Sequence, residues 1–220
     1  MRKFIILLLT FSSITIFAQN KAIVNLDTAL VAILDTLFYE DQTYREQLND
    51  IEKEYGLASE EVQNLWNIIH EKDSINLLKV REILDKRGWL GADVIGQQGS
   101  RTLFLVIQHA DLKTQIKYLP MLKNAVKKGN AQARHLALLE DRTLLGQGKK
   151  QIYGSQLMPD PETGELFVRP LKDPKNVNKR RAKVGLGTIE DYLLANWNIV
   201  WSIEEYKKKI SELSAKYGIK

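Results

Sequence analysis

The sequence predicts an all-α fold: a mainly helical single domain with one small β-hairpin around residues 151–171. Two observations support this. Apolar residues recur at helical spacing through most of the chain, beginning with the stretch Leu26–Leu37. A turn sequence, PDPETG, separates two short stretches that are typical of a hairpin, Gln151–Met158 and Glu165–Leu171. Two strands alone are marginal in water, so we expect the hairpin to pack on the helices.

Helical spacing predicts the first half of the chain in several segments. Those before residue 88 are Leu26–Leu37, Asp41–Tyr55, a helix that starts at Ser59, and a further helical set that ends at Arg87. The four glycines in residues 88–99 favour a loop with a short helical turn. Residues 103–107 are apolar on all sides and fit a buried helix or a buried strand; the polar continuation through Gln115 favours the helix.

The rest of the chain is expected to be helical except for the hairpin. The predicted helices are Pro120–Gly129, Ala131–Leu145, Asn176–Lys183, Thr188–Trp197 and a final amphipathic helix over residues 203–213.

The first residues are typical of a cleavable export signal. Arg2 and Lys3 precede an apolar run that reaches Phe17, and Ala18 follows. A membrane anchor is the alternative, but the run is short for a span of ~20 residues. We therefore expect residues 1–18 to be a signal peptide, cut after Ala18. Residues 19–220 would then form an exported single helical domain, periplasmic or secreted, without a stable membrane span.

Composition excludes several classes of protein. The chain has no cysteine, which excludes a thiol enzyme, disulfides and a lipoprotein anchor. Its net charge is +5, and removing the two cations of the signal leaves about +3, too little to argue for nucleic acid as a partner. Signatures of common hydrolases, nucleotide sites and metalloproteases are missing from the sequence. No cofactor is expected, and the oligomeric state is not indicated.

Gln108, His109 and Asp111 follow an apolar segment and so bring polar side chains to the end of a buried element. Burying such groups without partners costs about 2 kcal/mol or more, so they need hydrogen bonds or a solvated cleft. In the functional interpretation His109 is an acid or base that Asp111 orients. The alternative is hydrogen bonding at a helix end. We expect no metal site, because one His–x–Asp pair supplies too few ligands.

Two further polar groups lie downstream. Asp141 falls between two leucines on the inward face of its helix, where it must be paired or protonated; Arg142, Arg180 or Arg181 could supply the charge. An internal ion pair is favoured over catalysis there. Gln151, Tyr153 and Gln156 suit a neutral hydrogen-bonding ligand, although an ordinary hairpin explains them too. The cations of residues 172–183 form either an anion-binding rim or, as we favour, a solvated helix face.

As a set, these segments resemble an uncharacterised bacterial family, a domain of unknown function. The resemblance rests on DQTYR, GW, QHAD, LALLEDR, QIYGSQ and DPKNVNKRRAKVGL, which span about residues 41–190. It implies no activity, but it implies that the scattered polar residues belong to one unit. The ligand-binding candidates are Asp41, Gln42, Arg45, Gln108, Asp111, Gln115, Arg142, Gln151, Tyr153, Gln156, Arg180 and Arg181.

These residues support competing functions. The favoured hypothesis is an exported bacterial domain that binds a polar ligand (a glycan, a peptide or an anion) in the cell envelope. The alternative is an extracytoplasmic hydrolase that uses His109 and Asp141 as acid and base. A third interpretation is a purely structural network.

Overall fold

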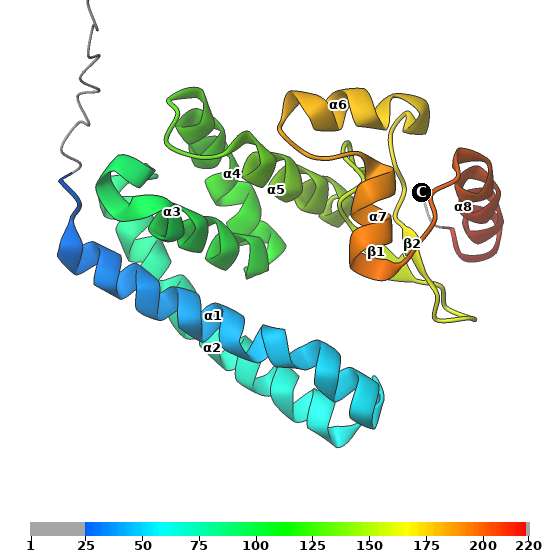
Figure 1. Cartoon of the computed structure of the whole chain (residues 1–220), viewed down its shortest axis with the longest axis horizontal. Coiled ribbons are helices and arrows are strands. Elements are labelled where there is room, and N and C mark those ends of the chain that lie inside the picture. Colours follow the sequence, from blue (N-terminus) through cyan, green and yellow to red (C-terminus); the bar gives the residue numbers. More distant parts are fainter. Residues whose placement is uncertain (1–24, 219–220) are drawn as a thin grey trace, which may run out of the picture.

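The computed structural model describes residues 25–218, so the predicted signal peptide lies outside the described residues. Helices α1 (Thr28–Tyr55) and α2 (Glu60–Arg87) form a long antiparallel hairpin (Figure 1). Both begin at side-chain caps: Asp27 accepts a hydrogen bond from the Leu30 amide at 3.1 Å, and Ser59 accepts one from the Val62 amide at 3.3 Å. These caps satisfy amide groups that a helix start leaves unpaired.

Each long helix is continuous where the sequence suggested two segments. No glycine or proline lies inside α1 or α2, so nothing stops the helical hydrogen bonds. The apparent breaks have a different cause. The apolar pattern is interrupted by polar residues at inward-facing positions, among them Asp41 in α1 and Asn76 in α2. In the sequence, a polar residue on the buried face of one helix was therefore mistaken for a break between two helices.

Helix α3 (Ala92–His109) packs against this hairpin. Helices α4 (Leu112–Lys127) and α5 (Ala133–Gly146) pack on each other and on α3. The expected loop at residues 88–99 is mostly the first part of α3, which kinks at Gly96, where φ is +71°. Helix α4 begins at Leu112, after its N-cap residue Asp111 and earlier than expected, and Pro120 lies inside it on the exposed side. Residues 103–107 are helical, as favoured.

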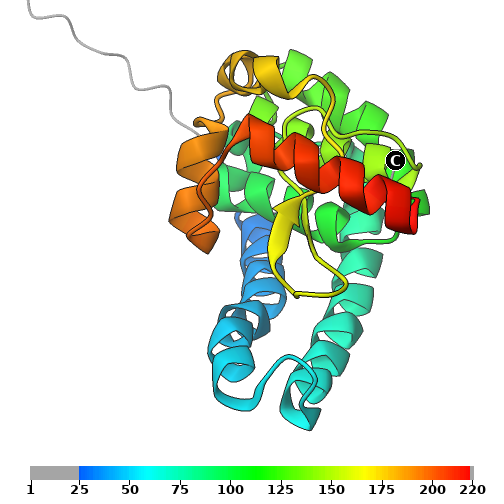
Figure 2. The ribbon, with the colours of Figure 1, turned by 90° about the vertical axis from the view of Figure 1, so that its right-hand side faces the viewer.

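The C-terminal part of the chain packs separately around a small apolar core. Strands β1 (Leu157–Pro159) and β2 (Leu166–Val168) form the hairpin, in the register Leu157 to Val168 and Pro159 to Leu166. Helix α8 (Ile203–Tyr217) lies across this hairpin (Figure 2). The remaining elements are the 3₁₀ helix η1 (Pro174–Asn176), α6 (Val177–Lys183) and α7 (Ile189–Trp197).

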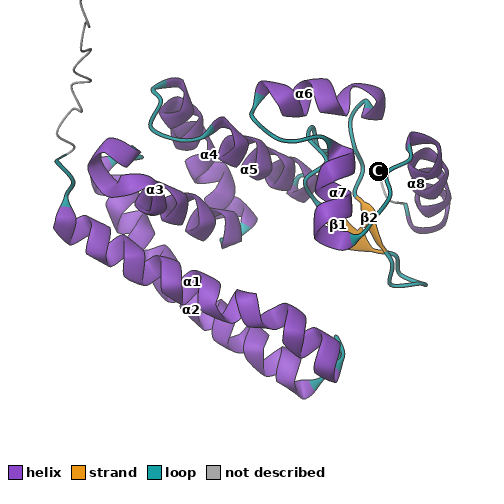
Figure 3. Cartoon of the chain, in the orientation of Figure 1, coloured by secondary structure: helices purple, strands orange, loops and turns teal. Residues whose placement is uncertain are grey.

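The predicted class, all-α with one small hairpin, is confirmed (Figure 3). Its strands are shorter than expected, because residues 151–155 form a loop instead of a strand. The main core is built from α1 to α5, with Leu34, Leu103 and Leu139 fully buried. Over residues 25–218, none of the helices combines the length and the apolar character needed to cross a membrane.

Candidate functional site

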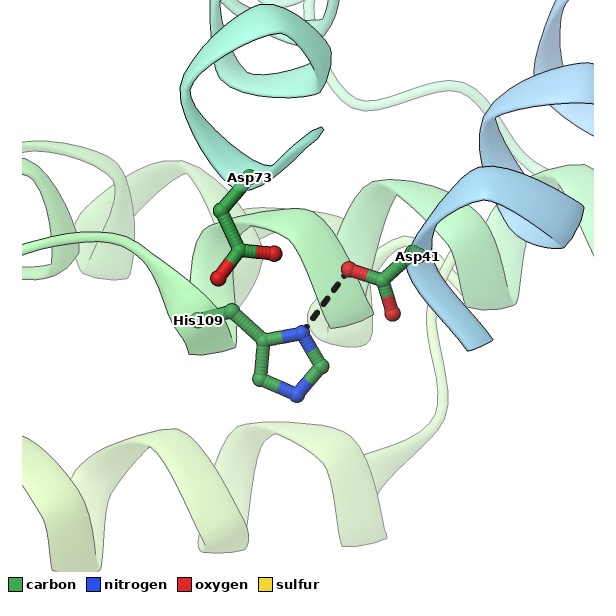
Figure 4. A group of neighbouring side chains, drawn as sticks. All are labelled: Asp41, Asp73 and His109. Atoms are coloured by element: carbon green, nitrogen blue, oxygen red, sulfur yellow. Dashed lines mark hydrogen bonds and ion pairs between the residues drawn. The ribbon is translucent and has the colours of Figure 1, made fainter. Parts of the chain in front are cut away.

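Asp41, Asp73 and His109 come together where α1, α2 and α3 meet (Figure 4). One donor atom from each side chain lies within 4.8 Å of the other two. His109 Nδ1 is 2.9 Å from Asp41 Oδ1. The Asp41 side chain is only 1% exposed, whereas Asp73 is 15% and His109 18% exposed. We call these three residues the three-helix site.

Helical spacing explains how two aspartates reach this buried position. In α1 the buried residues Leu34, Leu37 and Asp41 follow one another by three and four positions. In α2, Asp73 lies four residues after Ile69 on the same inward face. Asp41 and His109 were predicted from the sequence as site residues, whereas Asp73 was not. The signal was present, since a carboxylate stands at a position that the apolar spacing assigns to the core.

Two neighbouring side chains hold the outer oxygens of these carboxylates. Gln42 Nε2 donates to Asp41 Oδ2 at 2.6 Å, and Arg45 Nη2 donates to Asp73 Oδ2 at 2.7 Å. Arg45 also donates to the Asp41 carbonyl oxygen at 2.8 Å. Burial opposes the ionisation of Asp41, but the hydrogen bond and charge of His109, with Arg45 and Gln42, lower its pKa overall. Asp41 is therefore a carboxylate at neutral pH.

The expected partner of His109 was wrong. Asp111 is exposed and caps α4, where its Oδ1 accepts a hydrogen bond from the Thr114 amide at 2.7 Å. Asp41, 68 positions away in the sequence, takes the orienting place instead. A neutral His109 in this pair carries its proton on Nδ1, which leaves the Nε2 lone pair free. Within residues 25–218, no hydrogen bond involves Nε2.

Gln108 and Gln115 belong to the corner between α3 and α4. Gln115 is buried, and its Nε2 donates to the carbonyl oxygens of Gln108 at 3.0 Å and Ala110 at 2.8 Å. These bonds satisfy carbonyl groups at the end of α3. The contacts of Gln115 therefore support a structural role, that of fixing the turn that follows His109.

Asp141 is enclosed by the loop that follows α5. Its carboxylate accepts hydrogen bonds from the amides of Ile152 at 2.6 Å, Tyr153 at 2.9 Å and Ser155 at 3.0 Å, and from the Ser155 hydroxyl at 2.9 Å. Burial raises the pKa of Asp141, while these bonds oppose the rise. Backbone amides thus replace the arginine partner that we expected. Asp141 is completely buried and organises this loop.

Gln151, Tyr153 and Gln156 form part of the same enclosure. Gln151 is buried; its Nε2 donates to the carbonyl oxygens of Gln156 and Arg169, and its Oε1 accepts from the Gln156 amide at 2.9 Å. The Tyr153 hydroxyl donates to Glu140 at 3.4 Å. Burial, followed by the nearby charge of Glu140, raises the pKa of Tyr153 to about 12. This group therefore holds the loop closed on α5.

Arg180 and Arg181 also bind backbone groups of this loop. Arg180 Nε donates to the Ile152 carbonyl oxygen at 2.8 Å. Arg181 Nη1 donates to the Tyr153 carbonyl oxygen at 2.8 Å, and its Nε donates to that of Gly187 at 2.6 Å. Arg181 is only 2% exposed. Their guanidinium groups donate hydrogen bonds to carbonyl oxygens of the chain, so few of their N–H groups remain available for a ligand.

A different arginine cluster lies beside the three-helix site. Arg142 of α5 is exposed to solvent, and no hydrogen bond or ion pair involves its side chain within the described residues. Surrounding protein nevertheless desolvates the guanidinium and lowers its pKa, and the charges of Arg45 and Arg169 lower it further. Arg169, which the sequence pattern did not predict, has a buried Nε without a hydrogen-bond partner in the part of the chain that the structure describes. We call Arg45, Arg142 and Arg169 the arginine cluster.

Comparison with known proteins gives the chain a family. Residues 24–198 match a family of unknown function, DUF6624. The chain belongs to this family. The matched segment contains the three-helix site, the arginine cluster and the Asp141 enclosure, and it ends before α8. No protein with a curated description and no solved structure matches the chain.

Proposed function

We propose that this chain binds an anionic ligand, one that carries phosphate or carboxylate groups, at the arginine cluster. Arg142 carries the proposal: within the described residues its guanidinium has no hydrogen bond or ion pair, and the charges of Arg45 and Arg169 act unfavourably on it. Like charges in a partly desolvated place repel one another, and an anion relieves that repulsion. The sequence left three ligand classes open, a glycan, a peptide and an anion. The proposal selects the anion.

The state of the other two arginines also supports an anion. Arg45 is already paired with Asp73 and braced by the Asp41 carbonyl, so it has a fixed position. Arg169 offers a buried, unpaired Nε. A guanidinium presents its donors in a planar fork that matches the oxygens of a carboxylate or phosphate. Three such groups from separate parts of the chain suit a ligand with more than one oxyanion group.

The enclosure around Asp141 gives less support to the hydrolase hypothesis in its expected form. An acid or base needs a lone pair or proton that can reach the substrate. The Asp141 carboxylate is fully buried and accepts four hydrogen bonds from the loop. His109 retains a nitrogen without a protein partner, so acid–base chemistry on a bound anion would be centred on His109 alone.

Export is a part of the proposal that rests on the sequence. The charged start, apolar run and Ala18 predict a signal peptide. The ligand would then be an anion of the periplasm or the exterior.

Calorimetric titration of the mature chain with inorganic phosphate, pyrophosphate and citrate at low ionic strength tests the proposal. We expect at least one of these anions to bind, and Arg142→Gln to weaken its binding by roughly tenfold or more, because one charge-assisted contact contributes about 1.5–3 kcal/mol. Arg134→Gln is the matched control, since Arg134 is an exposed arginine of the same helix. Equal affinities in the two variants, or no binding by the wild type, would contradict the proposal.

A further inference from the structure

We infer that Asp41, Asp73 and His109 form a binding site for one divalent transition-metal ion of the zinc or manganese class. The inference does not depend on the anion proposal, because the metal ion alone is the ligand. It differs from the expectation drawn from the sequence, which saw only His109 and Asp111 and therefore too few ligands.

Three ligand groups from three helices converge at this site. Asp41, Asp73 and His109 are separated by more than thirty residues at each step, yet their donor atoms lie within 4.8 Å of one another. Figure 4 shows the two carboxylates and the imidazole pointing toward a common centre. Each ligand is attached to a helix of the main core, so the site is rigid without a metal.

The two oxygens of each carboxylate have different surroundings. Gln42 Nε2 donates to Asp41 Oδ2 at 2.6 Å and Arg45 Nη2 donates to Asp73 Oδ2 at 2.7 Å, while Arg45 Nη1 lies 3.6 Å from Asp41 Oδ1. Metal-binding carboxylates are commonly fixed by such outer hydrogen bonds, which orient the other oxygen toward the ion. This gives Gln42 and Arg45, two members of the DQTYR segment, a positioning role.

One carboxylate oxygen of the site has no hydrogen-bond donor beside it within the described residues. Asp73 Oδ1 is buried and has no hydrogen-bond partner in the described part of the chain. A buried, unpaired oxygen of a carboxylate destabilises the folded state, because it has lost its hydrogen bonds to water. A cation at the centre of the site satisfies this oxygen and also binds Asp41 Oδ1. An ion-pair network with Arg45 alone leaves it unsatisfied.

The proton on His109 must move when the metal binds. In the present arrangement Nδ1 is bonded to Asp41 Oδ1 at 2.9 Å and carries the proton of a neutral ring. A metal ion takes the Nδ1 lone pair, so the proton relocates to Nε2, or one proton is released if the ring is cationic.

The donor set indicates the class of ion. Two carboxylate oxygens and one imidazole, without any thiolate, suit manganese, iron or zinc. Three protein ligands leave at least one coordination position open, as in catalytic metal sites. Arg45 links the site to the arginine cluster, so an oxygen of a bound anion could occupy that position.

Titration of chelator-treated mature chain with Zn²⁺ or Mn²⁺ tests the inference. We expect one ion per chain, and we expect His109→Gln and Asp73→Asn each to weaken binding by about a hundredfold, since even outer-shell changes cost tenfold or more. His70→Gln and Asp50→Asn are the matched controls, because both residues are exposed on the same helix pair. No stoichiometric binding, or equal loss in the controls, overturns the inference.

A measurement on the wild type avoids dependence on variants that fail to fold. Nitrogen-15 NMR of the imidazole groups reports which ring nitrogen carries the proton and which binds a metal. On addition of Zn²⁺ we expect the His109 Nδ1 signal to change to a metal-bound value, with the proton on Nε2. The signals of His70 and His135 should stay unchanged. A His109 ring that keeps its proton on Nδ1 at saturating Zn²⁺ contradicts the site.

Discussion

The Asp141 enclosure and the three-helix site each contain an aspartate that is almost fully buried, but the two carboxylates are satisfied in different ways. Asp141 is surrounded by three backbone amides and one hydroxyl of a single loop. Asp41 is bound by side chains, one of which, His109, keeps an unused nitrogen, and its neighbour Asp73 keeps an unpaired oxygen. Burial of a polar group therefore does not identify a site; spare donors and acceptors around it do.

The largest expected effect is on the enclosure. Asp141→Ala leaves three amides of the loop unpaired, so we expect the free energy of unfolding to fall by about 3–5 kcal/mol. Urea unfolding at pH 7 measures this, with the exposed Asp50→Ala as the control. A loss below about 1 kcal/mol would show that the loop does not depend on Asp141.

The two histidines extend the comparison. His135 is buried, stacks on Phe104 with the ring centres 4.2 Å apart, and has an unpaired Nδ1. Burial, with the charges of Arg134 and Arg101, lowers its pKa to about 4. The unfolded chain therefore binds more protons between about pH 6.5 and pH 4, and stability is lost as the pH falls through this window.

The loss should reach about 3 kcal/mol at the acid end of that window. In His135→Leu this part of the pH dependence should disappear, whereas His70→Gln should retain it, because His70 is exposed. Urea unfolding at intervals between pH 7 and pH 4 gives the answer. A wild type and a His135→Leu variant with parallel pH profiles would refute a buried neutral His135.

A moderate effect is expected at Asp41. Asp41→Asn removes a charge that His109 and Arg45 stabilise, so we expect a loss of about 1–2 kcal/mol at pH 7. Because the pKa of Asp41 is lowered on folding, its contribution is present above the unfolded value of about 3.9 and is lost as the pH falls through the folded value. The difference between wild type and variant should therefore shrink in acid. Unfolding measured at pH 7 and pH 2.5 tests this, and a difference that grows in acid contradicts it.

The smallest effect on stability is expected at Arg142. Its guanidinium has no hydrogen bond or ion pair among residues 25–218 and is repelled by the charges of Arg45 and Arg169, so Arg142→Gln should change the free energy of unfolding by less than about 0.5 kcal/mol. Arg181→Gln is the contrasting variant, because Arg181 is buried and bonded to two carbonyl groups. We expect it to cost about 2–3 kcal/mol. Equal urea midpoints for the two variants would contradict the claim that Arg181 stabilises the fold and Arg142 does not.

Much of the fold could be predicted because helical periodicity is local. The spacing of Leu30, Leu34 and Leu37 is visible in the sequence, and so is the turn of the hairpin. Helix boundaries were less accurate, because a polar residue on an inward face looks like a break. The loop at residues 151–155 looked like a strand because its partner, Asp141, is a tertiary contact.

The site was only partly predictable for the same reason. His109 was selected for its position after an apolar segment, but its partner Asp41 lies two helices earlier. Asp73 was missed, although its spacing from Ile69 places it on the buried face of α2. Arg169 carries no local signal at all. Which arginines bind the chain and which remain available depends on packing that no single segment contains.

The most direct test of this distinction is NMR of the arginine Nε–Hε groups during a titration with pyrophosphate. One sample of the wild type reports on both regions at once. We predict that the signals of Arg142 and Arg169 shift and saturate, while those of Arg180 and Arg181 stay fixed in their backbone contacts. Shifts confined to Arg180 and Arg181, or no shift at any arginine, would contradict the account.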